Sequence, residues 1–148
     1  MTSDSDLFRS SEQLSNSGFK RKGTDWLPSS VAEGAKNVTR YVPLYEGKMN
    51  HQFDHRRGDF ALAKEKGDAE YREIPSPPIE FLADVNFEIT PRYWVSEDEV
   101  TARLQTKSWH RGWLMGWRDI TNPTNERTVI ATVFPRFGAN HKMPIFLH

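Results

Sequence analysis

The sequence predicts an α+β domain with a small antiparallel or mixed sheet, one or two short helices and an irregular N-terminal segment. Strand-like runs rich in aromatic and β-branched residues fill the second half of the chain, and a helix-start pattern interrupts them. The N-terminal part is polar and has little apolar periodicity. Hydrophobic residues make up 36% of the chain and aromatic residues 12%, which favours an aromatic-rich core or binding face beside poorly packed segments.

Composition divides the chain into two parts. Residues 1–38 are expected to be largely irregular, with one short helix at most, within residues 6–14. Residues 39–148 are expected to form a single α+β domain. Because the sequence ends directly after apolar residues, we expect this domain to be a piece of a longer chain.

The first part of the domain shows three local patterns. Residues 40–46 favour an extended segment or an edge strand, because Pro43 lacks the N–H that a central strand needs. The apolar and His residues of segment 47–57 have helical spacing, which predicts a short helix near His51. Residues 74–79 are rich in proline and break the chain into two halves without requiring two domains.

One helix in the second half has a clear start signal. Ser96 and Glu99 form a capping box, in which the Ser96 side chain accepts a bond from the backbone N–H of Glu99 and the Glu99 side chain reaches back. A helix over residues 97–105 follows, with Val100 and Leu104 facing inward.

Strands are predicted on both sides of this helix. Turn-forming residues at 121–125 separate two of them and predict a hairpin, and residues 138–140 predict a further turn. The predicted strands are residues 87–95, 113–120, 127–134 and 144–147.

Composition excludes several classes of protein. The chain has no Cys, which excludes disulfides, cysteine-based zinc ribbons and thiol catalysis. It has no apolar run of about 20 residues, so no membrane span is expected. Residues 1–17 are polar and acidic and do not resemble a signal peptide, so a cytoplasmic location is expected.

Charge is distributed unevenly although the formal net charge is zero. Residues 59–99 contain eleven acidic and four basic side chains, whereas residues 103–142 contain seven basic and two acidic ones. The basic part also carries aromatic residues, a combination that suits phosphate contacts with base stacking. The alternative is a pair of strands with solvated Arg on one face and core aromatics on the other.

The sequence offers one weak metal-binding pattern and no nucleophile. His51, Asp54 and His55 are candidate ligands, since two His at i and i+4 share a helix face. Gln52 stands where a helical zinc protease needs its Glu base, and spacing indicates no further ligand. The alternative is a hydrogen-bonded polar cluster. A Gly-x-Ser-x-Gly elbow and phosphate-binding Gly loops are also missing.

The turn of the predicted hairpin carries donor-rich side chains. The pairs Arg118-Asp119 and Glu126-Arg127 flank it and are expected to form cross-strand ion pairs. Its polar tip, together with Arg118 and Arg127, also suits contacts with phosphates or base edges. The tip donors are Asn122, Thr124 and Asn125.

Several segments, in order, resemble large adenine-specific DNA methylases. These are the single-chain type IIG restriction-modification enzymes and related phage-defence methylases. The resemblance covers most of the chain, except for the acidic residues 60–88, which match nothing in detail. The matching segments are YVPLYEGKMNHQFDHR (41–56), ITPRYWV (89–95), GWLMGWRDIT (112–121), NERTVIA (125–131) and PRFG (135–138).

The resemblance implies a position after the methylase core, on the side that recognises target DNA. The methyl-donor loop and the Asn-Pro-Pro-Tyr/Phe catalytic motif of that core do not occur here. We therefore expect no S-adenosylmethionine binding and no methyl transfer by this chain, and a cofactor site only in a separate methylase core. On the same resemblance, residues 39–148 are expected to be a fragment of a longer methylase-type chain.

Three functional hypotheses follow. The first is a non-catalytic, DNA-associated module that resembles the specificity region of a restriction-modification methylase. The second is a protein-interaction or scaffold fragment that docks on a methylase or restriction subunit. The third is a metal-dependent nuclease that uses the His51, Asp54 and His55 set. The first hypothesis predicts DNA contacts from Arg111, Arg118, Asn122, Asn125, Arg127, Arg136 and Lys142.

Overall fold

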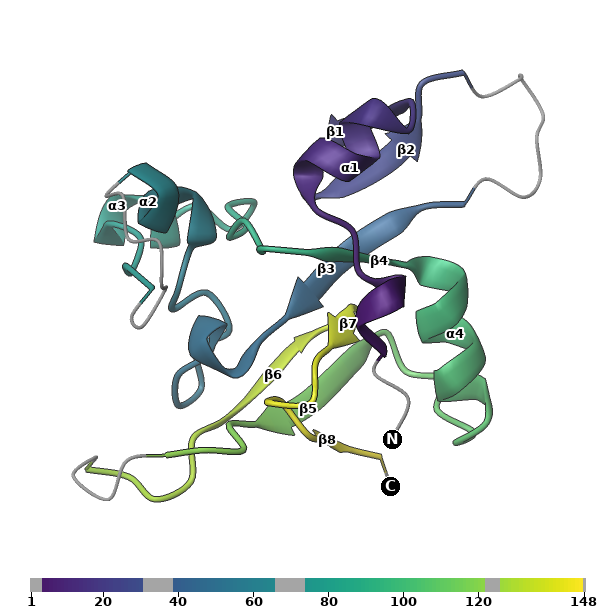
Figure 1. Cartoon of the computed structure of the whole chain (residues 1–148). Helices are drawn as coiled ribbons and strands as arrows, with labels where there is room; N and C mark the ends of the chain where they lie inside the picture. Colours follow the sequence, from purple (N-terminus) through teal and green to yellow (C-terminus); the bar gives the residue numbers. More distant parts are fainter. Residues whose placement is uncertain (1–3, 31–38, 66–73, 122–125, 148) are drawn as a thin grey trace.

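The computed structural model describes residues 4–30, 39–65, 74–121 and 126–147, which form an α+β fold of two sheets and short helices, as the sequence predicts (Figure 1). One sheet has the order β1-β2-β3-β4, with β7 also paired to β3, and the other has the order β6-β5-β8. The strands are β1 (Phe19–Lys22), β2 (Asp25–Pro28), β3 (Tyr41–Tyr45), β4 (Trp94–Ser96), β5 (Trp113–Trp117), β6 (Ala131–Pro135), β7 (Gly138–Ala139) and β8 (Ile145–Phe146). The α-helices are α1 (Ser11–Asn16), α2 (Phe60–Glu65), α3 (Ile79–Leu82) and α4 (Glu97–Gln105), and the 3₁₀ helices are η1 (Asp4–Leu7) and η2 (Gly47–Met49).

The N-terminal segment contains more regular structure than the sequence predicts. Reciprocal capping bonds start α1: the Gln13 N–H donates to Ser10 Oγ at 3.2 Å, and the Ser10 N–H donates to Gln13 Oε1 at 2.9 Å. β1 and β2 then pair as an antiparallel hairpin. The segment gains order because Leu14 and Trp26 are buried against Trp94 in a small second core. That contact is distant in the chain, so local composition does not reveal it.

β3 is a central strand, which corrects the prediction of an edge strand. On one side it pairs with β4, from Tyr41 opposite Ser96 to Pro43 opposite Trp94. On its other side β2 pairs only with Tyr41, and β7 starts to pair at Leu44. Pro43 therefore lies between the end of one neighbouring strand and the start of the next, where its missing N–H removes no ladder bond.

Segment 47–57 does not form the predicted helix around His51. It contains one 3₁₀ turn, η2, and then a tight loop in which His51 and Asp54 exchange backbone bonds of 2.7 and 3.0 Å. Gly47 brings this segment close to the C-terminal part, because an added Cβ there would lie 2.7 Å from the Lys142 carbonyl oxygen. Tertiary packing of this kind overrides the weak helical spacing.

α4 has the predicted bounds, but its start differs in detail. The Ser96 hydroxyl accepts a bond from the Asp98 N–H at 3.3 Å, one residue before the predicted partner Glu99. Val100 and Leu104 are buried, as the spacing predicts. With nine residues, α4 is the longest helix in the described parts of the chain, and no helix there is long and apolar enough to span a membrane.

The second sheet contains the predicted hairpin. β5 and β6 are antiparallel, with Trp113 opposite Pro135 and Trp117 opposite Ala131, and β8 pairs along the other edge of β5. Leu114 and Phe134 point into the main core, where they meet side chains from both sheets. Other buried members of this core are Val42, Leu44, Tyr45, Met49, Phe60, Ile89, Val95, Val100, Leu104, Trp109 and Met143.

Several predicted elements are different in the structure. β5 ends three residues before the predicted end at residue 120, and β6 begins four residues after the predicted start at residue 127. Of the strand predicted over residues 87–95, only its end is in β4, and the turn predicted at residues 138–140 contains β7. Gly138 permits this parallel pairing, because an added Cβ would lie 2.5 Å from Val95 Cγ1 and 3.0 Å from Leu44 Cδ1. Glycine at position 138 therefore serves the close packing of β7 and does not form the predicted turn.

Candidate nucleic-acid interface

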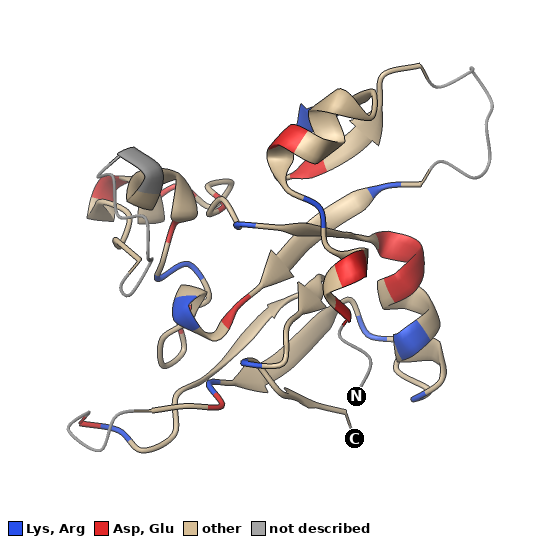
Figure 2. Ribbon diagram, in the orientation of Figure 1, with Lys and Arg blue, Asp and Glu red and all other residues tan. Residues whose placement is uncertain are grey.

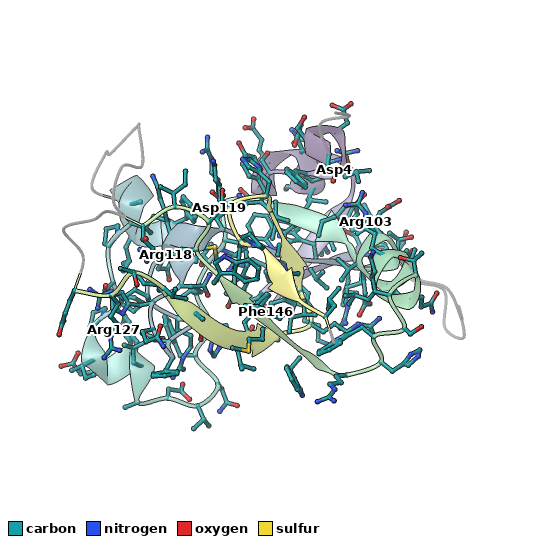
Figure 3. The ribbon with its side chains drawn as sticks, turned by 90° about the horizontal axis from the view of Figure 1, so that it is seen from below. Asp4, Arg103, Arg118, Asp119, Arg127 and Phe146 are labelled. Carbon is teal, nitrogen blue, oxygen red and sulfur yellow. The ribbon has the colours of Figure 1, made fainter. Side chains whose placement is uncertain are left out.

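The predicted DNA-contacting residues lie at two ends of the second sheet. Arg118 directly follows β5, whereas Arg111 precedes it by two residues, and Arg136 follows β6 at the Arg111 end. Because β5 spans five residues, roughly 17 Å separates these ends. Arg127 lies at the same end of the sheet as Arg118, and Figure 3 labels both residues. The predicted residues therefore form two groups and not one continuous surface.

Arg118 is a partly buried cation that is fixed by the backbone. Its Nη2 donates to the carbonyl oxygen of Asn50, and its Nε is buried with no hydrogen-bond partner among the described residues. Burial is the main reason why the pKa of Arg118 is lowered from its usual value, and the positive charge of Arg57 adds to this effect. Arg118 thus places a positive charge beneath the surface of the 47–58 segment.

His51 is subject to the charges of several neighbouring groups. Partial burial lowers the pKa of His51, and the positive charges of Arg57, Arg118 and Arg127 lower it further, whereas Asp54 opposes them. We call His51, Arg57, Arg118 and Arg127 the basic cluster. Figure 2 shows Lys and Arg on η2 and the segment after it, at the end of β5, and in the loop that connects β5 with β6.

Arg57 is the member of the basic cluster that sequence analysis missed. Its N–H donates to the Met49 carbonyl at 3.0 Å, and its side chain is exposed. The preceding Arg56 has a different role, because its guanidinium donates to the carbonyls of Leu82, Asp84 and Phe87 at 2.9 to 3.0 Å. Of these two adjacent arginines, Arg56 is thus bonded to the protein backbone and Arg57 is open to solvent. The pair of arginines was visible in the sequence, but this division was not.

Phe53 lies at the tip of the loop beside the basic cluster. Its backbone has φ of 61°, in the left-handed region, and its side chain is 84% exposed. The Phe53 N–H donates to the Ala131 carbonyl at 3.0 Å, and the Gln52 Oε1 accepts from the Ala131 N–H, also at 3.0 Å. A bulky residue at positive φ is unfavourable. The contacts with the start of β6 therefore hold an exposed aromatic ring in a strained position.

The metal-ligand set predicted around this loop is not assembled. His51 and Asp54 face each other through their backbones, and the Asp54 Oδ1 accepts a bond from the Arg56 N–H at 2.8 Å. The His55 ring lies 6.5 Å from the Tyr45 ring, and burial is the main cause that lowers the His55 pKa. Within the described residues, no three His, Cys, Asp or Glu side chains are grouped to hold a metal ion.

The second group of predicted residues has structural contacts. The Arg111 guanidinium lies over the rings of Trp109 and Trp113, at 5.3 and 5.1 Å from their centroids. Arg136 is partly buried, and its Nη2 donates to Thr101 Oγ1 on α4 at 3.3 Å. Arg111 remains exposed and available to a phosphate, whereas Arg136 chiefly connects β6 to α4.

The predicted cross-strand ion pairs are replaced by other contacts. Asp119 pairs with Lys142 at 4.0 Å, and its N–H donates to the Lys142 carbonyl at 3.1 Å, so Lys142 lies at the Arg118 end of the sheet. At the base of the turn, the Thr121 hydroxyl donates to the Thr128 carbonyl at 2.9 Å. The tip donors that sequence analysis predicted lie outside the described residues. These are Asn122, Thr124 and Asn125.

The outer face of the second sheet is apolar. Alternation along the strands turns Leu114 and Phe134 inward and the intervening side chains outward. Trp117 and Phe146 pack against each other on this face, with ring centroids 4.2 Å apart, and Figure 3 shows Phe146 there. The outward residues with substantial exposure are Trp113, Met115, Val133 and Phe146, which we call the apolar face.

Comparison with known proteins does not assign the chain to a family. No protein-family model, no curated protein and no solved structure matches it. The resemblance to DNA methylases therefore stays a prediction. The basic cluster with Phe53, and the apolar face, are the features from which a function is proposed.

Proposed function

We propose that this chain is a non-catalytic, DNA-associated module that contacts a DNA strand through the basic cluster and Phe53. One observation carries the proposal: an exposed aromatic ring is held at positive φ in the same tight loop as His51, on which the positive charges of three arginines act. Strained backbone of this kind concentrates at functional sites. A ring that is 84% exposed contributes little to the core, so binding is the better explanation for its position.

The residue types in this group match the two parts of a nucleotide strand. The Arg57 and Arg127 guanidinium groups are suited to phosphate oxygens, to which they present several donors in a fixed plane. Arg118, fixed from below by Asn50, adds positive potential. The Phe53 ring is suited to stack on a base that is unpaired or partly unstacked. The sequence resemblance to the target-recognition side of adenine methylases favours DNA as the nucleic acid.

Fluorescence anisotropy with a random-sequence duplex and a single strand, at two salt concentrations, tests the proposal. Binding should weaken steeply with salt, because each neutralised phosphate contributes about −0.9 to the log–log slope for a duplex. Arg127→Ala should lower affinity and make the slope shallower by about 0.9. Lys107→Ala is the matched control, since Lys107 is exposed after α4 and outside the basic cluster. No binding at low salt, or equal effects of both variants, would contradict the proposal.

A second candidate function rests on the apolar face. Monomeric proteins seldom expose a contiguous patch of large apolar side chains, so this face favours docking on another protein. The sequence resemblance points to a methylase or restriction subunit as the partner. Replacing both Met115 and Val133 with Gln, which adds polarity without charge, should weaken co-elution with such a subunit in gel filtration and leave DNA affinity unchanged. Co-elution that survives this double change would count against the second candidate.

A further inference from the structure

A cavity of about 480 Å³ lies between η1, α4, β5 and β7, and it is lined mainly by apolar side chains. Its volume is in the range of small-molecule sites, which combine apolar walls with a few polar groups. Figure 3 shows Asp4 and Arg103, which line it, away from Arg118 and Arg127, so it is distinct from the proposed DNA site. The main apolar lining residues are Phe8, Leu44, Val100, Leu104, Leu114 and Phe137.

The charged groups of this cavity include one ion pair with two hydrogen bonds. Arg103 donates from Nη1 and Nη2 to the two carboxylate oxygens of Asp4, at 3.0 and 3.1 Å. This two-bond arrangement is the preferred geometry between a guanidinium and a carboxylate. Glu99 lies one helical turn before Arg103 and also lines the cavity, as does His141. Arg103 is therefore a cation of this cavity that can bind a carboxylate, and Asp4 occupies it in this structure.

Asp4 lies at the exposed start of η1. Both partners of the ion pair have side chains that are 54% exposed, and η1 has no fully buried residue, although Leu7 at its end packs partly against the main core. The segment is fixed after Asp4, by the packing of Leu7 and Phe8 on the main core and by backbone bonds of 2.9 and 2.8 Å that Arg9 and Trp94 exchange. Exposed ion pairs contribute little to stability, so another carboxylate can replace Asp4 without disturbing the core.

We propose that this cavity binds a small carboxylate with an apolar tail, whose head group replaces Asp4 on Arg103. The tail would contact the apolar lining, and Asp4 would act as an internal competitor for the same guanidinium. The opposite head group, an amine, would have to rely on Glu99 while Arg103 repels it. The proposal thus predicts a preference for the anion over a cation or an alcohol of the same chain length.

Isothermal titration calorimetry of the full chain with octanoate, octylamine and octanol tests this preference. Octanoate should bind at least about tenfold more tightly than the other two, because a charge-assisted, two-bond contact with Arg103 is available only to the carboxylate. Arg103→Gln should remove the preference, and Asp4→Asn should increase octanoate affinity because the competitor is lost. Both sites are exposed, so neither change is expected to unfold the protein.

Three results would overturn the proposal. Equal affinity for the three compounds would show an apolar site without anion recognition. An unchanged preference in Arg103→Gln would assign recognition to another residue. No octanoate binding by Asp4→Asn, with a circular dichroism spectrum like that of the unchanged protein, would show that the cavity does not accept this class of ligand. DNA affinity should be unchanged in both variants, which separates this test from that of the proposed function.

Discussion

The backbone N–H of Phe53 donates to the carbonyl of Ala131 at 3.0 Å, and this bond joins a strained loop to the first residue of β6. The Gln52 side chain adds a second bond to the same residue. Together these contacts keep the exposed Phe53 ring beside the basic cluster. These bonds connect two segments that are far apart in sequence. Because they come from the Phe53 backbone and the Gln52 side chain, the Phe53 ring can be changed without removing them.

Phe53→Asn is expected to stabilise the protein and weaken DNA binding. Asn adopts positive φ more readily than Phe, and little burial is lost because the ring is exposed. The free energy of unfolding should rise by roughly 0.5–1 kcal/mol in urea denaturation. Affinity for single-stranded DNA should fall, whereas Phe53→Tyr keeps the ring and should retain it. Unchanged affinity in Phe53→Asn would remove the stacking role.

Arg56→Ala should lower stability, whereas the adjacent change Arg57→Ala should lower DNA affinity. Arg56→Ala removes hydrogen bonds to three carbonyls around α3, so the free energy of unfolding should fall by about 1–3 kcal/mol. Arg57→Ala should leave stability nearly unchanged and reduce DNA affinity with a shallower salt slope. Urea denaturation and anisotropy on the same two proteins measure both effects. Equal losses of affinity in the two variants would argue against the basic cluster as the contact surface.

Stability should decrease as the pH falls below about 6.5. Burial and the nearby arginines lower the pKa values of His51 and His55 in the folded protein from their ordinary value of 6.5. The unfolded chain therefore takes up more protons in the range from 6.5 down to the lowered values, and protonation there favours unfolding. Urea midpoints measured between pH 7.5 and 5 should show this decline. Replacing both His51 and His55 with Gln should make this decline in stability smaller. An unaltered decline would show that other groups cause it.

DNA affinity should have the opposite pH dependence. A bound phosphate beside His51 favours its protonated form, so binding takes up a proton and tightens as the pH falls through the same range. Anisotropy at constant ionic strength measures this change. His51→Gln should make affinity less dependent on pH, and the same pH dependence in both proteins would exclude His51 from the contact.

Gly138→Ala should destabilise the fold without a direct effect on the interface. The added Cβ would lie 2.5 Å from Val95 Cγ1, so the core must shift, and we expect a loss of about 1–3 kcal/mol in the free energy of unfolding. Gly112→Ala is the matched control, because no atom lies within 4 Å of its added Cβ and its φ is not positive. Equal stability of the two variants in urea would contradict the close packing of β7 on β3.

Local signals predicted part of this fold correctly. The bounds of α4 follow from the polar start at Ser96 and the spacing of Val100 and Leu104, and these local features survive in the structure. The hairpin of β5 and β6 follows from two strand-like runs around turn residues. Such elements are predictable because residues close in sequence specify them.

Other features depend on contacts between distant segments. Pro43 is accommodated in a central strand only because β2 ends and β7 begins beside it. Arg57 and Phe53 join Arg118 and Arg127 only after the 47–58 segment packs against β6. The sequence indicated a basic, aromatic surface and named its residues as one set. The structure places them at two ends of a sheet, where Arg136 bonds to α4. Spacing along one segment carries no information on such pairings.

The most direct test of the proposed function is an NMR titration of the ¹⁵N-labelled chain with a short DNA duplex at low salt. The account predicts that the largest amide shifts occur at Phe53, Arg57, Arg118 and Ala131, and that added salt reverses them. Shifts centred on Trp113 and Phe146, or no shifts at all, would contradict the assignment of DNA binding to the basic cluster.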